Sequence, residues 1–265
     1  FQRGPRHRQL TWVSRGSTTW ENNLAEGTHD AVIASSIDPD RYQHRRFYRN
    51  NGSAAELTAQ IDAGTDLVVY SGHGFETGWL RYDYGTARLA GLSNTLDAPI
   101  VLGHCCLTGA FQLDDCFAEA WLETTARAVA YVGGSENTYW EADDRLERAE
   151  FAWLAENPTG TLGAALDGAL RQTAADHPAL AEYYFSVYHI FGDPTVRPFG
   201  QTVTIHHDPV AGSSDRAGPY AIEATVSSSS ALTAVTLRWR LAGQAVFQAV
   251  PMTPVAGSLW RGLIP

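Results

Sequence analysis

Two short apolar segments of this chain each run directly into a residue that could do nucleophilic chemistry. The segment DLVVY (66–70) leads into His73, which stands between two glycines, and the segment PIVLG (99–103) leads into Cys105 and Cys106. A thiolate is a strong nucleophile, and a nearby imidazole can take its proton and later return it to a leaving group. The pattern predicts a cysteine nucleophile with a histidine base.

Both segments have the form of central strands in a parallel sheet. They are short, continuously apolar and bounded by glycine or polar residues, which is typical of strands covered on both faces. Functional groups of open α/β sheets gather beyond the carboxyl ends of the strands. His73 and Cys106 are 106 − 73 = 33 residues apart, which fits one strand–helix–strand crossover, so we expect them to be neighbours in space.

The glycines beside His73 would let the backbone approach a substrate carbonyl closely. The N–H groups of Gly74 and Cys106 are therefore candidates for an oxyanion hole. Each member of the pair also has a plain structural interpretation. His73 could cap a helix, and a lone cysteine is usually a small buried hydrophobe. Their joint placement after two strands favours the catalytic interpretation, whereas Cys105 and Cys116 are expected in the core.

The wider chain divides by its periodicity near Phe199. Residues 1–199 alternate strand-like and helix-like segments, which predicts an α/β domain with a mostly parallel sheet flanked by helices. One of these helices is expected to begin at His29 with Thr28 as its cap. Residues 200–265 show period-two alternation between Gly, Ser and Pro clusters, which predicts an antiparallel β-sandwich of immunoglobulin type, cut short by the end of the chain.

Composition narrows the choice of partners. The chain has 265 residues, a formal net charge of −10 and a pI near 5.3, which argues against nucleic acid or an anionic membrane as the main partner. No apolar run is long enough to span a membrane. The chain begins without Met and ends on LIP, so we expect a piece of a longer polypeptide, and we expect a monomer.

Three longer motifs carry a family resemblance. HGFETGW (73–79) resembles the HG-x-ET-x-W segment of the gingipain family of cysteine peptidases, and CLTGAF followed by CFAEAWLE resembles that family's C-x-N-G-x-F followed by PCFAEA. HIFGDPTVRPF (189–199) resembles the FGDP segment that ends the gingipain catalytic domain before an immunoglobulin-like module. The motifs occur in the family's order and cover roughly residues 10–199.

The resemblance implies a caspase-like fold and peptide-bond hydrolysis through a thioester acyl-enzyme, with His73 as base and Cys106 as nucleophile. It also implies a polypeptide substrate and a secreted or cell-surface location. The acidic residue that arginine-specific gingipains have near the histidine aligns with Arg15 or Gly16 here. Glu76 could orient His73 instead, or could simply structure its loop, and both roles stay open.

The resemblance also suggests a pocket for a basic P1 residue, the residue whose carbonyl is attacked. A segment like the family's HENVIA occurs here as HDAVIA (29–34), which puts Glu26 and Asp30 near the position of the specificity acid. A buried carboxylate there would select Arg or Lys by a charge-assisted hydrogen bond. Trp140 falls where the family has an aromatic residue in the pocket wall.

No cofactor is required for this chemistry. The acidic cluster EADD (141–144) could hold a structural calcium ion, or it could be the solvated start of a helix. Two functional alternatives to an endopeptidase stay open. One is a sortase-like transpeptidase of the same family, in which an amine replaces water. The other is a non-catalytic surface adhesin on a peptidase scaffold, supported by the lack of an acid near Arg15.

Overall fold

The computed structural model describes residues 8–94, 98–123, 127–200, 203–208, 218–228, 232 and 234–265. The chain forms two compact units. The larger one spans Arg8–Gly200, and the strands from Val203 onward belong to the smaller one.

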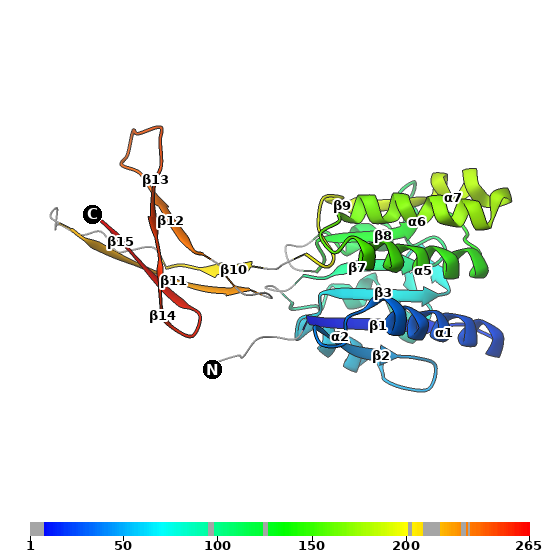
Figure 1. The fold of residues 1–265 in the computed structure, drawn as a ribbon. Coiled ribbons are helices and arrows are strands. Elements are labelled where there is room, and N and C mark those ends of the chain that lie inside the picture. Colours follow the sequence, from blue (N-terminus) through cyan, green and yellow to red (C-terminus); the bar gives the residue numbers. More distant parts are fainter. Residues whose placement is uncertain are drawn as a thin grey trace. The chain divides into compact units, whose positions relative to one another are not determined.

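A six-stranded sheet forms the centre of the larger unit, with the strand order β2-β1-β3-β7-β8-β9 (Figure 1). All neighbouring strands are parallel except β8 and β9. The strands are β1 (Arg8–Arg15), β2 (Tyr42–Phe47), β3 (Leu67–Gly72), β7 (Ile100–His104), β8 (Ala130–Gly134) and β9 (Tyr188–Gly192). The prediction of a mostly parallel sheet is confirmed, and the two segments that precede His73 and Cys106 are the adjacent strands β3 and β7.

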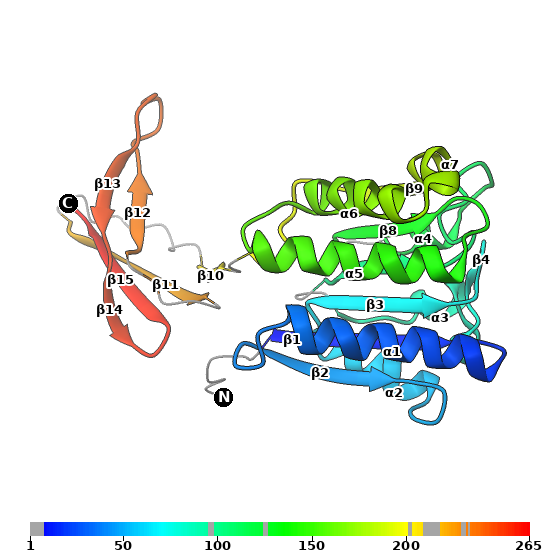
Figure 2. The same ribbon diagram turned by 45° about the vertical axis from the view of Figure 1, so that its right-hand side comes forward.

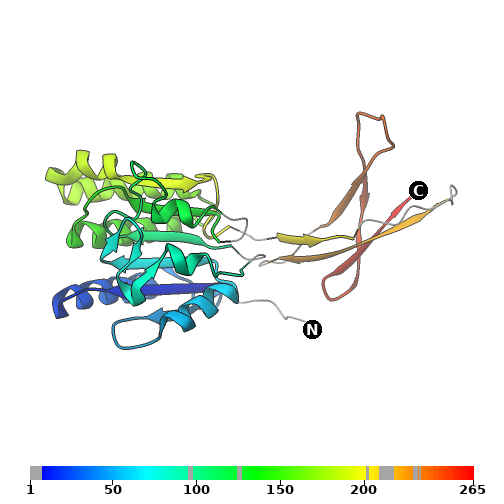
Figure 3. The ribbon, with the colours of Figure 1, turned by 180° about the vertical axis from the view of Figure 1, so that it is seen from behind.

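Helices cover both faces of this sheet (Figures 2 and 3). On one face lie α1 (Thr19–Ser36), α5 (Trp140–Glu156), α6 (Leu162–Asp176) and α7 (Ala181–Val187). On the other face lie α2 (Ala54–Asp62), α3 (Thr86–Leu89) and α4 (Phe117–Ala120). Shorter elements are β4 (Gly74–Phe75), β5 (Gly78–Trp79), β6 (Tyr84–Gly85) and the 3₁₀ turns Arg81–Asp83 and Pro178–Leu180.

The alternation of side chains along β3 explains why its sequence is apolar throughout. Leu67 and Val69 pack into the core under α1 and α5, whereas Val68 and Tyr70 pack into the core on the other face. All four side chains are fully buried. A strand covered on both faces needs apolar residues at every position, and this rigid centre fixes where its carboxyl end lies.

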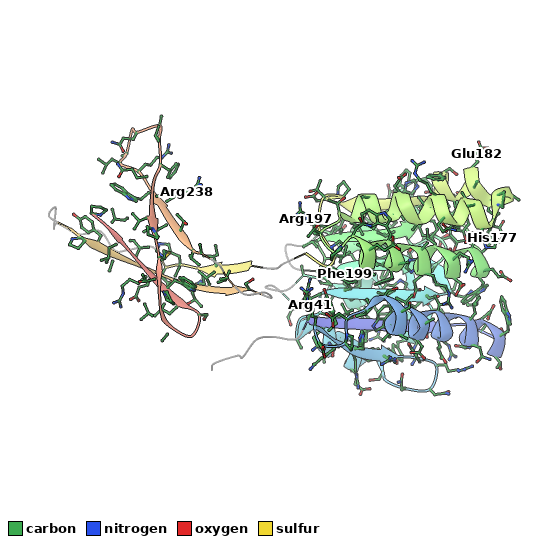
Figure 4. All side chains as sticks on the ribbon, viewed as in Figure 1. Arg41, His177, Glu182, Arg197, Phe199 and Arg238 are labelled. Atoms are coloured by element: carbon green, nitrogen blue, oxygen red, sulfur yellow. The ribbon has the colours of Figure 1, made fainter. Side chains whose placement is uncertain are left out.

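The last residues of the larger unit pack where the strands β1 and β2 begin. Figure 4 shows Phe199 and His177 at opposite ends of this unit. The Phe199 ring lies 5.3 Å from the Tyr42 ring and 6.1 Å from the Phe151 ring, measured between centroids. The Arg8 guanidinium donates to the carbonyl groups of Pro198 and Gly200. These hydrogen bonds join the start and the end of the larger unit.

The smaller unit consists of antiparallel strands. β10 (Val203–His206), β11 (Tyr220–Ser228), β15 (Leu259–Ile264) and β14 (Thr253–Ala256) form one sheet, and β12 (Thr236–Trp239) and β13 (Gln248–Pro251) form another. Its buried core is small, with Ala224, Val226 and Met252 at the centre. The immunoglobulin-like type of this unit stays a prediction. Across all the described residues, every helix is too short or too polar to cross a membrane.

Candidate active site

A pocket lies just beyond the carboxyl ends of β3 and β7. It is lined by Gly72, His73, Cys106, Thr138, Trp140 and Asp143. The two residues expected to do the chemistry therefore face the same pocket, because they follow two adjacent parallel strands. Among the described residues, no hydrogen bond joins the His73 imidazole to the Cys106 sulfur, whose partners all belong to Thr138.

His73 is held firmly by its backbone. Its N–H donates to the Arg15 carbonyl at 3.1 Å, and its carbonyl accepts from the Leu80 N–H at 3.0 Å and from the Tyr70 hydroxyl at 2.6 Å. Its imidazole stands edge-on to the Trp140 indole, with 5.2 Å between ring centroids. The backbone anchors leave the ring facing the pocket with an aromatic wall beside it.

A carboxylate that the sequence did not single out faces this imidazole. Oε1 of Glu21, on the first turn of α1, lies 3.5 Å from Nε2 of His73. The other oxygen of Glu21 accepts from the N–H groups of Ser17 and Thr18, both at 2.7 Å, and Thr18 caps the helix in return. Burial alone would raise the pKa of Glu21, but these amides and the nearby His73 lower it below its ordinary value.

The family's acidic position aligns with Arg15 or Gly16, which carry no carboxylate, and Glu21 lies a few residues further along, on α1. The predicted helix start at His29 is wrong, since α1 begins at Thr19 with Thr18 as its cap. The motif Thr18-x-x-Glu21 is a capping box, a signal in the sequence that could have located this carboxylate. The adhesin alternative loses its main support, because an acid does lie beside His73.

Glu76 does not take the orienting role in this structure. It forms no ion pair with His73 among the described residues, and its backbone carbonyl accepts from the Phe117 N–H at 2.7 Å. This contact connects the loop after His73 to α4. The contact is made by the backbone, so a loop-structuring role for the Glu76 carboxylate stays a prediction.

Cys106 sits in a tight turn. The next residue, Leu107, has a left-handed backbone with φ of 60°, a conformation that costs a non-glycine residue about 1 kcal/mol and is common at functional sites. Gly74 packs directly against the Cys106 carbonyl, so that a side chain there would overlap it and would come within 2.8 Å of the Cys105 sulfur. The two amides assigned to the oxyanion hole thus lie on adjoining backbone segments.

The other two thiols are in the core. Cys105 is 1% exposed, and burial raises its pKa well above the ordinary value. Cys116 is also 1% exposed, and burial raises its pKa to about 11. Both stay protonated at neutral pH, so Cys106 is the accessible thiol of the three.

The two acids predicted for a P1 pocket lie outside it. Glu26 accepts from the Arg49 N–H at 2.9 Å and pairs with its guanidinium at 3.2 Å. Asp30 pairs with Arg46 at 2.9 Å. Both acids lie on the outer part of α1 and already have cationic partners from the chain itself, whereas Trp140 does line the pocket.

The acid that lines the pocket is Asp143, on the first turn of α5. Its Oδ1 accepts from the hydroxyls of Tyr184 at 2.9 Å and Tyr188 at 2.6 Å, and its Oδ2 accepts from Thr138 at 2.5 Å. Burial raises its pKa above the ordinary value, although these hydroxyls and His104 oppose the shift. Its neighbour Asp144 accepts from Arg148 instead, and within the described ranges no cluster of His, Cys, Asp or Glu is arranged to hold a metal ion.

Behind the pocket, four buried titratable side chains form a network. Nδ1 of His29 lies 2.7 Å from Oε1 of Glu147, and Nε2 of His29 lies 3.1 Å from the Val13 carbonyl. Nε2 of His104 lies 3.2 Å from Oε2 of Glu150, and its Nδ1 lies 3.4 Å from Oε2 of Glu147. The network joins α1, β7 and α5. Glu21 lies on α1, Asp143 lies on α5, and Cys106 follows β7.

The sequence model of peptidase family C25 matches residues 6–199. The chain belongs to peptidase family C25. The C25 chain is 28% identical over 167 residues to Lys-gingipain W83 of Porphyromonas gingivalis, a match that covers 53% of this chain and 10% of the relative. It is 24% identical over 194 residues to gingipain R2 of the same species, covering 69% of this chain and 26% of that protein.

Solved structures agree on the fold. The Arg-specific cysteine proteinase gingipain R superimposes with a TM-score of 0.65 at 20% identity, covering 97% of the C25 chain and 60% of the other. The complex of the P. gingivalis RgpB pro- and mature domains gives a TM-score of 0.63 at 18% identity, covering 97% and 62%. The C25 chain therefore spans about a quarter or less of these two relatives and about three fifths of these two solved chains.

Proposed function

We propose that residues 1–199 form a cysteine endopeptidase domain in which Cys106 is the nucleophile and His73 the general base. The observation that carries this proposal is that both side chains face one pocket at the carboxyl ends of β3 and β7. Glu21 supports it, because a carboxylate 3.5 Å from Nε2 favours the imidazolium that forms when His73 takes a proton.

The reaction divides into two acyl transfers. The Cys106 thiol proton passes to His73, and the thiolate attacks the substrate carbonyl carbon to form a tetrahedral oxyanion. The N–H groups of Gly74 and Cys106 would stabilise this oxyanion. His73 then donates its proton to the leaving amine as the C–N bond breaks, and water hydrolyses the thioester with His73 again acting as base. No cofactor takes part in these steps.

For the P1 residue we propose a basic side chain, with Asp143 in place of Glu26 and Asp30 as its partner. Asp143 is the acid in the lining of the pocket and shares it with Cys106, whereas the other two are neutralised by arginines. Trp140 would form the wall along the aliphatic part of the side chain. The similarity to Lys-gingipain and to the Arg-specific gingipain R supports a basic residue.

The remaining assignments are also proposals. Residues 200–265 would be an immunoglobulin-like module, which is supported by their antiparallel strands. A secreted or cell-surface location would follow from the resemblance to gingipains. A monomer is the default expectation for a chain with a net charge of −10. The C25 chain would act on polypeptides.

Alkylation of the thiols tests the nucleophile directly. At pH 7 and low excess, iodoacetamide should modify Cys106 selectively, and His73→Ala should slow this labelling sharply. Cys105 and Cys116 act as internal controls, because both are buried protonated thiols. Turnover of a peptide with a basic P1 residue should fall by about 10²- to 10⁴-fold in His73→Ala and disappear in Cys106→Ser. Equal labelling of all three thiols would contradict the proposal.

Mass analysis of the products separates hydrolysis from transpeptidation. With an added peptide amine, an endopeptidase releases a free carboxylate, whereas a sortase-like enzyme joins the acyl fragment to the amine. We expect the free carboxylate, and a joined product as the main species would favour the transpeptidase alternative.

A further inference from the structure

Thr138 lies between the proposed nucleophile and the acid of the pocket, and it contacts both. Its N–H donates to the Cys106 sulfur at 3.3 Å, and its Oγ1 lies 3.8 Å from the same sulfur. The same Oγ1 lies 2.5 Å from Oδ2 of Asp143. One side chain thus connects the residue that would attack the substrate to the residue that would recognise it.

A hydroxyl carries a single proton, so Thr138 can donate to the carboxylate or to the sulfur but not to both at once. In this structure Thr138 donates its hydroxyl proton to Oδ2 of Asp143, because the distance of 2.5 Å is that of a charge-assisted hydrogen bond. The distance of 3.8 Å to sulfur is near the upper limit for such a contact. The hydroxyl is therefore held away from the sulfur, and within the described part of the chain no Arg or Lys forms an ion pair with Asp143.

The hydrogen-bond capacity of Asp143 shows where a cation would bind. A carboxylate offers about four acceptor sites, two on each oxygen. Tyr184 and Tyr188 occupy both sites on Oδ1, whereas Thr138 occupies one on Oδ2. The remaining site is on Oδ2, so an incoming ammonium or guanidinium would share this oxygen with the Thr138 hydroxyl.

We propose that Thr138 couples recognition of a basic side chain to activation of Cys106. A cation at Oδ2 of Asp143 repels the hydroxyl proton and weakens its bond to the carboxylate. The hydroxyl then turns to the Cys106 thiolate, which becomes the stronger acceptor. The S–H bond of Cys106 breaks as its proton forms an N–H bond with His73, and the Thr138 proton stays on its own oxygen throughout.

The inference deepens the proposed function and rests on Asp143 as the P1 acid. Thr138 is a positioning residue in this scheme, because it acts through Cys106 and need not contact the substrate. A purely structural role would be different: Thr138 would tie its loop to α5, and the reactivity of Cys106 would not depend on what occupies the pocket.

The rate of Cys106 alkylation by iodoacetamide, measured with and without butylammonium, tests the coupling without any peptide turnover. Neutral butanol is the matched control for crowding of the pocket. In wild type and in Thr138→Ser, butylammonium should accelerate labelling relative to butanol by about tenfold, the effect of one hydrogen bond to a charged group. In Thr138→Val, which keeps the N–H and the shape but loses the hydroxyl, the acceleration should vanish.

Calorimetric titration of butylammonium distinguishes the two ways in which the idea can fail. If the cation does not bind wild type, or binds Asp143→Asn equally well, both the P1 assignment and the coupling are wrong. If it binds wild type but Thr138→Val responds as wild type does, only the coupling is overturned. If Thr138→Val proves unstable to urea, the labelling rates of wild type and Thr138→Ser still test the proposal. Absence of acceleration by butylammonium in both proteins would contradict it.

Discussion

Oε1 of Glu21 lies 3.5 Å from Nε2 of His73, across the gap between the first turn of α1 and the loop after β3. Both side chains are more than half buried, with exposed fractions of 15% and 32%. The capping box fixes the other carboxylate oxygen, so Glu21 presents its free oxygen to the imidazole in a defined orientation. The carboxylate is thus within ion-pair distance of an imidazole that has no hydrogen bond to Cys106 among the described residues.

Replacing Glu21 with Gln should lower kcat/KM about tenfold. The amide keeps the shape but removes the negative charge that favours the His73 imidazolium, and one such charged interaction is worth about 1.5 kcal/mol. The pH–rate profile of peptide hydrolysis checks this, because the rate of Glu21→Gln should lie below that of wild type by this factor near neutral pH. Glu76→Gln is the matched control and should leave the profile unchanged. If the control moved the profile as far as Glu21→Gln, the orienting acid would be misassigned.

The sequence predicts the pair His73 and Cys106 because each follows an apolar strand with no intervening element. The local sequence pattern is enough to predict a functional residue that directly follows a strand. Glu21 was missed because the helix was predicted to start at His29, nearly three turns after its true start at Thr19. The capping box Thr18-x-x-Glu21 marks the true start of the helix. The family's acidic position, however, aligns with Arg15 or Gly16, at the end of β1.

Partners that are distant in the sequence account for the other differences. Glu26 and Asp30 are acidic residues near the expected position, and their local sequence does not reveal that the chain supplies Arg49 and Arg46 to neutralise them. Asp143 looks like part of a solvated helix start. Its burial depends on tyrosines about forty residues further along the chain, which no local pattern indicates.

Asparagine at position 143 should abolish the preference for a basic P1 residue. Loss of the carboxylate removes a charge-assisted hydrogen bond, so kcat/KM for a Lys or Arg substrate should fall about 10- to 100-fold. The value for a neutral P1 residue should change little. Paired substrates that differ only at P1 measure this ratio, with Glu26→Gln as the control that keeps it. An unchanged ratio in Asp143→Asn would exclude this acid from recognition.

Alanine at position 74 should disrupt both the fold and the site. A methyl group there overlaps the Cys106 carbonyl and approaches the Cys105 sulfur to 2.8 Å, so backbone must shift, at a cost of about 1–3 kcal/mol. Gly27→Ala is the matched control, because it lies exposed in α1 with nothing within 4 Å of the added carbon. That change should stabilise the protein by up to about 1 kcal/mol. Urea unfolding and Cys106 labelling measure the two effects, and a fully active, stable Gly74→Ala would contradict the close approach.

The buried network behind the pocket should make stability depend on pH through His104. Burial alone would lower the pKa of His104, but Glu150 and Glu147 raise it above its ordinary value of 6.5. A group whose pKa is raised in the folded state adds stability below its unfolded pKa and loses it as pH rises through the folded value. Glu147 has the opposite sign: its pKa is lowered from 4.5, so its contribution is present above that value and disappears in acid.

The difference in unfolding free energy between wild type and His104→Gln isolates this contribution. It should be largest below pH 6.5 and shrink steadily at higher pH, because only wild type gives up the proton of His104. Urea titrations from pH 5.5 to about 9 measure it. His177→Gln is the control, since among the described residues the His177 side chain has no hydrogen-bond or ion-pair partner. A difference that stays constant with pH would mean that the pKa of His104 is the same in the folded and unfolded states, and a difference that grows with pH would mean that His104 is held neutral in the folded protein.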